Sequence, residues 1–151
     1  MNILATQYSL QKKALEIYLA GCLGAPHCKN CHNPESWNFN QGTNYLKETN
    51  NILQKITDFN SLIDNIYILG GEPLDQPFDK LTNLLTTLKS KNKDIWLFTR
   101  YEIEEIPWYI LKLTDYVKCG RYIEEYKSAV NHYGVELAST NQKIYKKGID
   151  Y

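Results

Sequence analysis

Short apolar runs alternate with segments of helical periodicity along this chain, and this alternation limits its fold more than any other feature. Strands separated by helices pair in parallel, with right-handed crossovers between them. In such sheets, ligands bind at the carboxyl ends of the strands. The strands are expected at residues 14–20, 65–69, 95–98 and 116–119, with a weaker one at 135–138.

Three other segments have the spacing of amphipathic helices. The clearest covers residues 78–88, where an aromatic residue and four leucines recur every three or four positions. A second helix is expected after Thr43, a candidate N-cap, with Leu46 on its apolar face. A third is expected over residues 108–113, with a proline at its first turn.

The chain length of 151 residues fits one domain, on the usual size of about 100–200 residues. No internal repeat, low-complexity tract or long linker divides the sequence, so residues 1–151 are expected to form a single domain. A closed barrel of eight strand–helix units needs at least about 200 residues. The expected fold is therefore α/β, a partial, open (β/α) barrel with mostly parallel strands.

Composition excludes several classes of function. Lysine plus arginine equals aspartate plus glutamate at 17 each, so no net charge holds the chain to nucleic acid or an anionic membrane. The sequence does not open with a basic segment followed by an apolar stretch. No run approaches the roughly 18 apolar residues of a membrane span. We expect a cytoplasmic protein that binds neither nucleic acid nor membrane.

Three cysteines are concentrated in a Gly-, Pro- and Asn-rich loop directly after the first expected strand. Cys22, Cys28 and Cys31 lie within ten residues, so their thiolates can converge on one metal centre. Thiolates are the usual ligands of iron–sulfur clusters, normally four per cluster. Three ligands on a four-iron cluster leave one iron open, and an open metal position is where a substrate binds.

Two alternative roles for these cysteines stay open. The thiols can form a structural zinc site with His27 or His32, which would make the chain a zinc-stabilised binding module without catalysis. Structural zinc sites usually draw two ligand pairs from separate segments, and no second pair is evident. The thiols can also be reduced and free of metal. The fourth cysteine, Cys119, is isolated in the sequence and is interpreted as a bystander.

The second expected strand stops at Gly70-Gly71-Glu72-Pro73. Two glycines let the backbone approach a ligand where any Cβ would block it. Pro73 lacks an N–H and fixes the exit of the turn, which leaves carbonyl oxygens free to accept hydrogen bonds. Alone, such a turn is usually structural. Downstream of a cysteine loop we interpret it as a site for an ammonium group, with Glu72 adding charge or orienting the loop.

The third expected strand opens onto the same edge at Thr99-Arg100. A hydroxyl and a guanidinium there can bind ribose hydroxyls and a carboxylate. The alternative is a helix cap for Thr99 and a surface ion pair for Arg100. Asn30 and His32 flank the third cysteine, and His32 either covers an adenine ring or fills the loop. These four residues complete the candidate site.

Together these motifs resemble the radical S-adenosylmethionine enzymes, which carry a cysteine loop after one strand and a Gly-Gly-Glu-Pro turn after the next. Residues 31–37 are similar to the Cys-[aromatic]-Asn-x-x-[Ser/Thr]-Trp segment of one subgroup, the activating enzymes of anaerobic (class III) ribonucleoside-triphosphate reductase. Residues 97–101, 119–125 and 139–142 resemble later landmarks of that subgroup. The resemblance covers about residues 19–144.

The resemblance implies an oxidoreductase with the partial barrel of that superfamily and a [4Fe–4S] cluster held by Cys22, Cys28 and Cys31. The reduced cluster would cleave S-adenosylmethionine to a 5′-deoxyadenosyl radical, which would generate a glycyl radical on a partner anaerobic ribonucleotide reductase. Reduced flavodoxin or ferredoxin is the implied electron donor. An undersized barrel suits this chemistry because a loop of the partner can enter and close the site. The implied cofactor contacts are Asn30, His32, Gly70, Gly71, Glu72, Pro73, Thr99 and Arg100.

Three departures from the family pattern keep a second enzyme interpretation open, in which the same chemistry acts on a small molecule or a peptide. The cysteines are spaced Cys-x5-Cys-x2-Cys, whereas the superfamily usually has Cys-x3-Cys-x2-Cys. The glycine-rich turn that the subgroup carries before the first strand is replaced by residues 9–13. Cys119 stands where the subgroup has an aspartate before Gly120.

Overall fold

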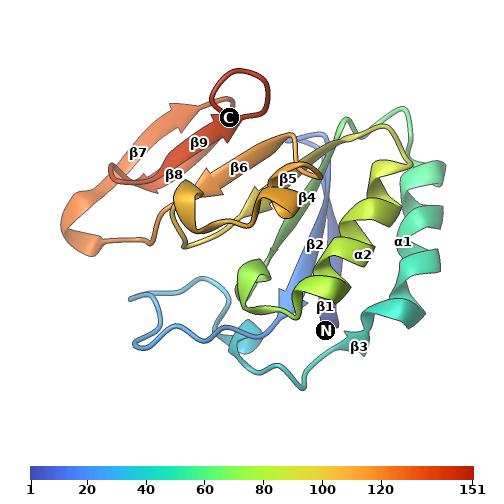
Figure 1. Cartoon of the computed structure of the whole chain (residues 1–151), viewed down its shortest axis with the longest axis horizontal. Coiled ribbons are helices and arrows are strands. Elements are labelled where there is room, and N and C mark those ends of the chain that lie inside the picture. The colour runs from blue at the N-terminus through green and yellow to red at the C-terminus, as the bar shows by residue number, and fades with distance from the viewer.

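The computed structural model describes every residue from Met1 to Tyr151 and contains a seven-stranded sheet, three helices and a separate two-stranded hairpin (Figure 1). The sheet consists of β1 (Asn2–Ser9), β2 (Ala14–Ala20), β3 (Thr43–Asn44), β4 (Asn65–Gly70), β5 (Asp94–Phe98), β6 (Tyr116–Cys119) and β9 (Lys143–Lys146). The hairpin strands are β7 (Lys127–His132) and β8 (Val135–Ser139). The helices are α1 (Tyr45–Asp58), α2 (Phe78–Lys89) and α3 (Trp108–Leu111), with 3-10 turns η1 (Pro34–Trp37), η2 (Pro73–Asp75), η3 (Ile103–Glu105) and η4 (Glu124–Tyr126).

The strand order in the sheet is β3-β1-β2-β4-β5-β6-β9. The central strands β2, β4, β5 and β6 pair in parallel, whereas β1, β3 and β9 add antiparallel pairs at the two sides. The sheet is therefore open, and the carboxyl ends of its four parallel strands meet at one edge. The partial-barrel description of this sheet stays a prediction. No helix is both long enough and apolar enough to cross a lipid bilayer.

Side-chain alternation along the parallel strands builds two cores on opposite faces of the sheet. Ile66 and Ile68 of β4 join the larger core with Leu84 of α2, on the face that α1 and α2 cover. Tyr67 and Trp96 point to the other face and pack against β8 of the hairpin. The helices thus cover one face of the sheet, and the hairpin covers part of the other.

The strands expected at 14–20, 65–69, 95–98 and 116–119 are present as β2, β4, β5 and β6. The helix expected after Thr43 is α1, but its N-cap is Asn44, whose side chain accepts a hydrogen bond from Leu46 N (3.0 Å). This shift of one residue corrects the predicted apolar face. Leu46 is 64% exposed, and Tyr45 is buried in its place.

Three further differences concern strands. Strand β1 was not predicted from the sequence, because only Ile3 of this strand is buried and its polar residues interrupt the apolar pattern. The strand expected at 135–138 forms as β8, but it pairs with β7 in the hairpin rather than with the main sheet. The edge strand that pairs with β6 is β9, which was also not predicted.

Candidate functional site

The cysteine loop leaves β2 at Gly21, and backbone hydrogen bonds close its base. Gly21 N donates to Ser36 O (2.7 Å), and Cys22 N donates to Trp37 O (3.2 Å). Gly21 has a φ of +115°, and a Cβ at this position would lie 2.1 Å from the ring of Phe39. Only glycine accommodates both the conformation and the contact, so it determines how the loop leaves the sheet.

All three loop cysteines have free, partly buried thiols and line one cavity of about 210 Å³, the inner cavity. Residues at the carboxyl ends of β4, β5 and β6 form much of the rest of its wall, as expected for a parallel sheet. No three His, Cys, Asp or Glu side chains surround a position for a single metal ion. The structure therefore brings the predicted cysteines to one cavity but does not gather them around one ion.

His27, a candidate zinc ligand from the sequence, packs inside the loop. Its ring stacks on Trp37 with 3.9 Å between the ring centroids and 8° between the planes. Its Nε2 atom lies 3.2 Å from Cys22 O, within hydrogen-bond distance. These contacts give His27 a structural place in the loop.

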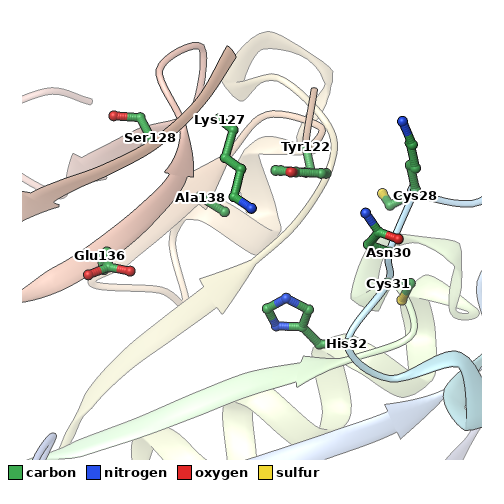
Figure 2. Close-up of a pocket in the computed structure, with 10 residues that line it drawn as sticks. Cys28, Asn30, Cys31, His32, Tyr122, Lys127, Ser128, Glu136 and Ala138 are labelled. Atoms are coloured by element: carbon green, nitrogen blue, oxygen red, sulfur yellow. The ribbon is translucent and has the colours of Figure 1, made fainter. Parts of the chain in front are cut away.

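Asn30 and His32 line a second cavity of about 370 Å³, the outer cavity, between the cysteine loop and the β7–β8 hairpin (Figure 2). Figure 2 shows His32 on the loop side and Lys127 on the hairpin side. Cys28 and Cys31 line both cavities, so the two spaces meet at these thiols. The structure thus separates Asn30 and His32 from Gly70, Gly71, Glu72, Thr99 and Arg100, which line the inner cavity, whereas Pro73 lines neither cavity.

Gly70 and Gly71 line the inner cavity, but the protein's own backbone occupies the space on their Cβ side. At Gly70, where φ is +117°, a Cβ would lie 2.2 Å from Leu19 O. At Gly71 it would lie 2.1 Å from Gly21 O. The sequence-based interpretation assigned this space to a ligand, whereas the structure fills it with β2 and the start of the cysteine loop. Pro73 is buried and begins η2.

The Glu72 carboxylate is the centre of a buried network that joins the ends of β4 and β5. It is 2% exposed and accepts hydrogen bonds from Leu74 N (3.0 Å), Thr99 Oγ1 (2.6 Å) and Arg100 N (2.8 Å). Burial raises the pKa of Glu72, and these three hydrogen bonds oppose the increase. In this structure Glu72 orients the turn, and the Thr99 hydroxyl donates its hydrogen bond to the Glu72 carboxylate.

Asp75, which was not predicted as a site residue, connects this network to the cysteine loop. Its side chain is 1% exposed and accepts hydrogen bonds from Leu23 N (2.6 Å), Arg100 Nη2 (3.1 Å) and Tyr101 Oη (2.7 Å). The Leu23 amide directly follows the first cysteine, so Asp75 positions the start of the loop. The sequence feature that could have identified Asp75 is its position, three residues after Glu72 at the end of a strand.

Arg100 forms a largely buried ion pair. Its Nη2 atom lies 3.1 and 3.2 Å from the two carboxylate oxygens of Asp75 and donates to Tyr101 Oη (2.8 Å). Its Nε atom is buried without a hydrogen-bond partner, 4.0 Å from Glu72 Oε2. Because an unpaired buried donor costs about 1–3 kcal/mol, this N–H favours a bound polar group.

Lys118 is a second cation in the wall of the inner cavity, and it too was not predicted from the sequence. Alternation along β6 directs Val117 and Cys119 into the larger core, so Lys118 points to the opposite face. Its Nζ atom lies 3.5 Å from Gly120 O and takes part in none of the ion pairs. Burial lowers the pKa of Lys118 to about 8, and the nearby thiols of Cys119 and Cys28 oppose the decrease.

Cys119 is 1% exposed and lies in the larger core, away from the inner cavity. Burial raises the pKa of its thiol to about 12, so the group stays protonated near neutral pH. Its place in the core agrees with the expected role of a bystander.

The residues around the inner cavity fit an iron–sulfur cluster and a polar cofactor. The donors are three thiols, the ligands that such clusters use, and a cluster spaces its ligands more widely than a single ion does. The wall adds the unpaired Nε–H of Arg100 and the ammonium group of Lys118. A ligand with acceptor or anionic groups would satisfy both.

Comparison with known proteins agrees with this arrangement. A family model described as a 4Fe-4S single cluster domain matches residues 13–145 of the chain. The chain is 33% identical over 114 residues to the anaerobic ribonucleoside-triphosphate reductase-activating protein of Enterobacteria phage T4, which covers 70% of this chain and 69% of the relative. Proteins of the same name from Vibrio cholerae and Salmonella typhimurium are 26% and 25% identical. These alignments cover 86% and 85% of this chain and 85% of each relative.

The matched region of the family model includes the cysteine loop and all four parallel strands. The resemblance that the motifs indicated is confirmed by both kinds of comparison. The chain belongs to the family of anaerobic ribonucleoside-triphosphate reductase-activating proteins, enzymes built on a 4Fe-4S single cluster domain.

Proposed function

We propose that this chain activates an anaerobic ribonucleoside-triphosphate reductase by generating a glycyl radical on it, with S-adenosylmethionine as the radical source. The observation that carries the proposal is one shared cavity. Three free thiols from a single loop line it together with Gly70, Gly71 and Arg100. The names of the relatives, which are reductase-activating proteins, support the choice of partner.

Cys22, Cys28 and Cys31 would hold a [4Fe–4S] cluster in the inner cavity. When bound and reduced, the cluster supplies the electron that breaks a sulfonium C–S bond of S-adenosylmethionine, which gives methionine and the 5′-deoxyadenosyl radical that removes a hydrogen atom from the partner's glycine. The thiols must lose their protons to bind iron. Burial raises the pKa of Cys22 and so favours its protonated thiol, and a bound iron atom would have to displace that proton.

The cofactor would be bound by groups of the inner cavity and its outer rim. The turn at residues 70–73 would accept the ammonium group, while the Glu72 network holds the turn and the end of β5 in register. Arg100 Nε would donate to a polar group of the cofactor. Asn30 and His32 would contact the adenosine from the outer cavity.

The partner would enter through the outer cavity, which reaches Cys28 and Cys31 from between the cysteine loop and the hairpin (Figure 2). A glycine residue suits this approach because it has no side chain to keep its Cα away from the reacting atoms. Reduced flavodoxin or ferredoxin would deliver the electron.

The test is anaerobic reconstitution of the chain with iron and sulfide, followed by dithionite and S-adenosylmethionine. We expect a brown protein that forms 5′-deoxyadenosine, measured by chromatography. Addition of the anaerobic reductase from the same genome should then produce a glycyl-radical signal in electron paramagnetic resonance. Absence of 5′-deoxyadenosine from protein that contains iron and sulfide would reject the radical mechanism.

The same experiment separates the two alternatives. Formation of 5′-deoxyadenosine without any glycyl radical on the reductase would redirect the search to a small-molecule or peptide substrate. One zinc ion per chain after anaerobic purification, without sulfide, would favour the zinc-stabilised binding module.

A further inference from the structure

The inner cavity has two cations in its wall, Arg100 and Lys118, and their surroundings differ. Arg100 lies 3.1 Å from Asp75 Oδ1 and 4.0 Å from Glu72 Oε2, so two carboxylates share one guanidinium. Even with Glu72 protonated, Asp75 alone neutralises Arg100. The guanidinium can donate a hydrogen bond, but it brings no uncompensated charge to a ligand.

The charge of Lys118, in contrast, is not compensated by a neighbouring carboxylate. No carboxylate forms an ion pair with it, and its one polar contact is the 3.5 Å approach to Gly120 O. Its orientation is set by the fold, because the neighbours Val117 and Cys119 are buried in the core on the other face of β6. The side chain therefore projects into the cavity that the three loop cysteines line.

We propose that Lys118, rather than Arg100, binds the α-carboxylate of S-adenosylmethionine in the inner cavity. This inference rests on the proposed function and assigns the one anionic group of the amino-acid portion of the cofactor. A lysine ammonium is a compact charge with three donors, and a charge-assisted hydrogen bond to a carboxylate is about twice as strong as a neutral one. The sequence had suggested Arg100 as the residue that binds this carboxylate, and we assign that contact to Lys118. The Nε–H of Arg100 then donates a hydrogen bond to an uncharged acceptor of the cofactor.

The test compares Lys118→Met with the unchanged protein, both reconstituted with iron and sulfide and studied without turnover. Calorimetry gives the dissociation constants for S-adenosylmethionine and for decarboxylated S-adenosylmethionine, which lacks only the carboxylate. We expect the substitution to weaken S-adenosylmethionine binding by about tenfold to a hundredfold. Binding of the decarboxylated analogue should change by less than about twofold, because its interaction with Lys118 is already missing.

Three further variants keep the result interpretable. Lys118→Arg retains the charge and should retain most of the affinity, whereas Lys118→Gln is a second neutral variant in case Lys118→Met does not fold. Lys143→Met, on the exposed side of the adjacent strand β9, removes a lysine outside both cavities and should leave both dissociation constants unchanged.

Several results would overturn the inference. Equal weakening of both ligands would show that Lys118 does not act on the carboxylate. Unchanged affinities with a shifted reduction potential of the cofactor-free cluster would assign Lys118 to the cluster instead. An unchanged protein that holds the cluster but binds no S-adenosylmethionine would reject the proposed function itself, and the inference with it.

Discussion

The cysteine loop and the strand-end network lie next to each other but are built in opposite ways. The loop runs from Gly21 to the start of β3, and its only regular element is the short turn η1. The strand-end network consists of Glu72, Asp75, Thr99 and Arg100, whose side chains are largely buried and are joined by hydrogen bonds, one of them from the Arg100 backbone N–H. The segment that would bind the metal is thus irregular, and the segment that supports it is closely packed.

The two regions are connected at the base of the loop. Asp75 accepts a hydrogen bond from Leu23 N, and Gly21 N donates to Ser36 O. Cys28 and Cys31 lie beyond these connections and share one local hydrogen bond, from Cys31 N to Cys28 O (3.2 Å). The fold therefore determines where the loop starts and returns, while metal binding is left to order the thiols between those points.

Substitution of a loop cysteine should have the largest effect. Each of Cys22→Ser, Cys28→Ser and Cys31→Ser should abolish cluster assembly, measured as iron and sulfide per chain, because a three-thiolate site has no spare ligand. The free energy of unfolding of the metal-free protein should change by less than about 1 kcal/mol, since these thiols are only partly buried. Cys119→Ala is the matched control and should keep its iron. A loop variant with full iron and sulfide would contradict the assigned ligands.

Substitution within the strand-end network should mainly lower the stability of the metal-free protein. The two oxygens of Glu72 accept from three donors, and Glu72→Gln replaces one of these oxygens with an amide N–H₂, so at least one buried donor is left unpaired. We expect a loss of about 1–3 kcal/mol in the unfolding free energy of the metal-free protein, measured by urea denaturation. Glu104→Gln, at an exposed position, should stay within about 0.5 kcal/mol of the unchanged protein. Equal stability of the two variants would mean that the network does not support the fold.

The pH dependence of stability tests the burial of the core cysteine, Cys119. The pKa of Cys119 is raised from 9.0 to about 12, so above about pH 9 its thiol ionises in the unfolded chain but not in the folded one. Stability is therefore lost as pH rises, at up to about 1.4 kcal/mol per pH unit. Between pH 9 and 10.5 the unchanged protein should lose about 1.5 kcal/mol relative to Cys119→Ala, as urea denaturation would reveal. Parallel stability curves for the two proteins would refute this assignment.

The smallest expected effect concerns the packing of the loop. His27→Ala removes a ring stacked on Trp37, which should lower the stability of the metal-free protein by about 1 kcal/mol or less. Iron and sulfide content after reconstitution should be unchanged, because His27 is not proposed as a ligand. Loss of the metal in this variant would instead support a zinc or iron site in which His27 is the fourth ligand.

Much of the scaffold was predictable from local patterns. The buried runs of β2, β4 and β5 and the leucine spacing of α2 depend on periodicity that neighbouring residues carry. Strands with mixed polarity were less accessible, because β1 and β9 gain their place from pairing with distant strands rather than from their own composition. The cap of α1 shifted by one residue, from Thr43 to Asn44, since both residue types can cap a helix.

Some residues of the candidate site could likewise be identified from the sequence, and others could not. The cysteines and the Gly-Gly turn were identifiable because few kinds of site combine these residue types at this spacing. Asp75 and Lys118 were not, because an aspartate after a turn and a lysine in a strand are common in any sequence. The role of Gly70 and Gly71 is only partly readable from the sequence, because the backbone atoms nearest their Cβ positions belong to Leu19 at the end of β2 and to Gly21 at the start of the loop, about fifty residues earlier.

The sequence by itself determined the chemical type of the site: three thiols in one loop, followed by glycine, carboxylate and guanidinium groups at successive strand ends. These features are covalent and local, so no folding is needed to recognise them. Only the tertiary structure decided which of those groups are free to act. Charge compensation depends on neighbours in space, and the fold pairs Arg100 with Asp75 while it leaves Lys118 unpaired beside the thiols.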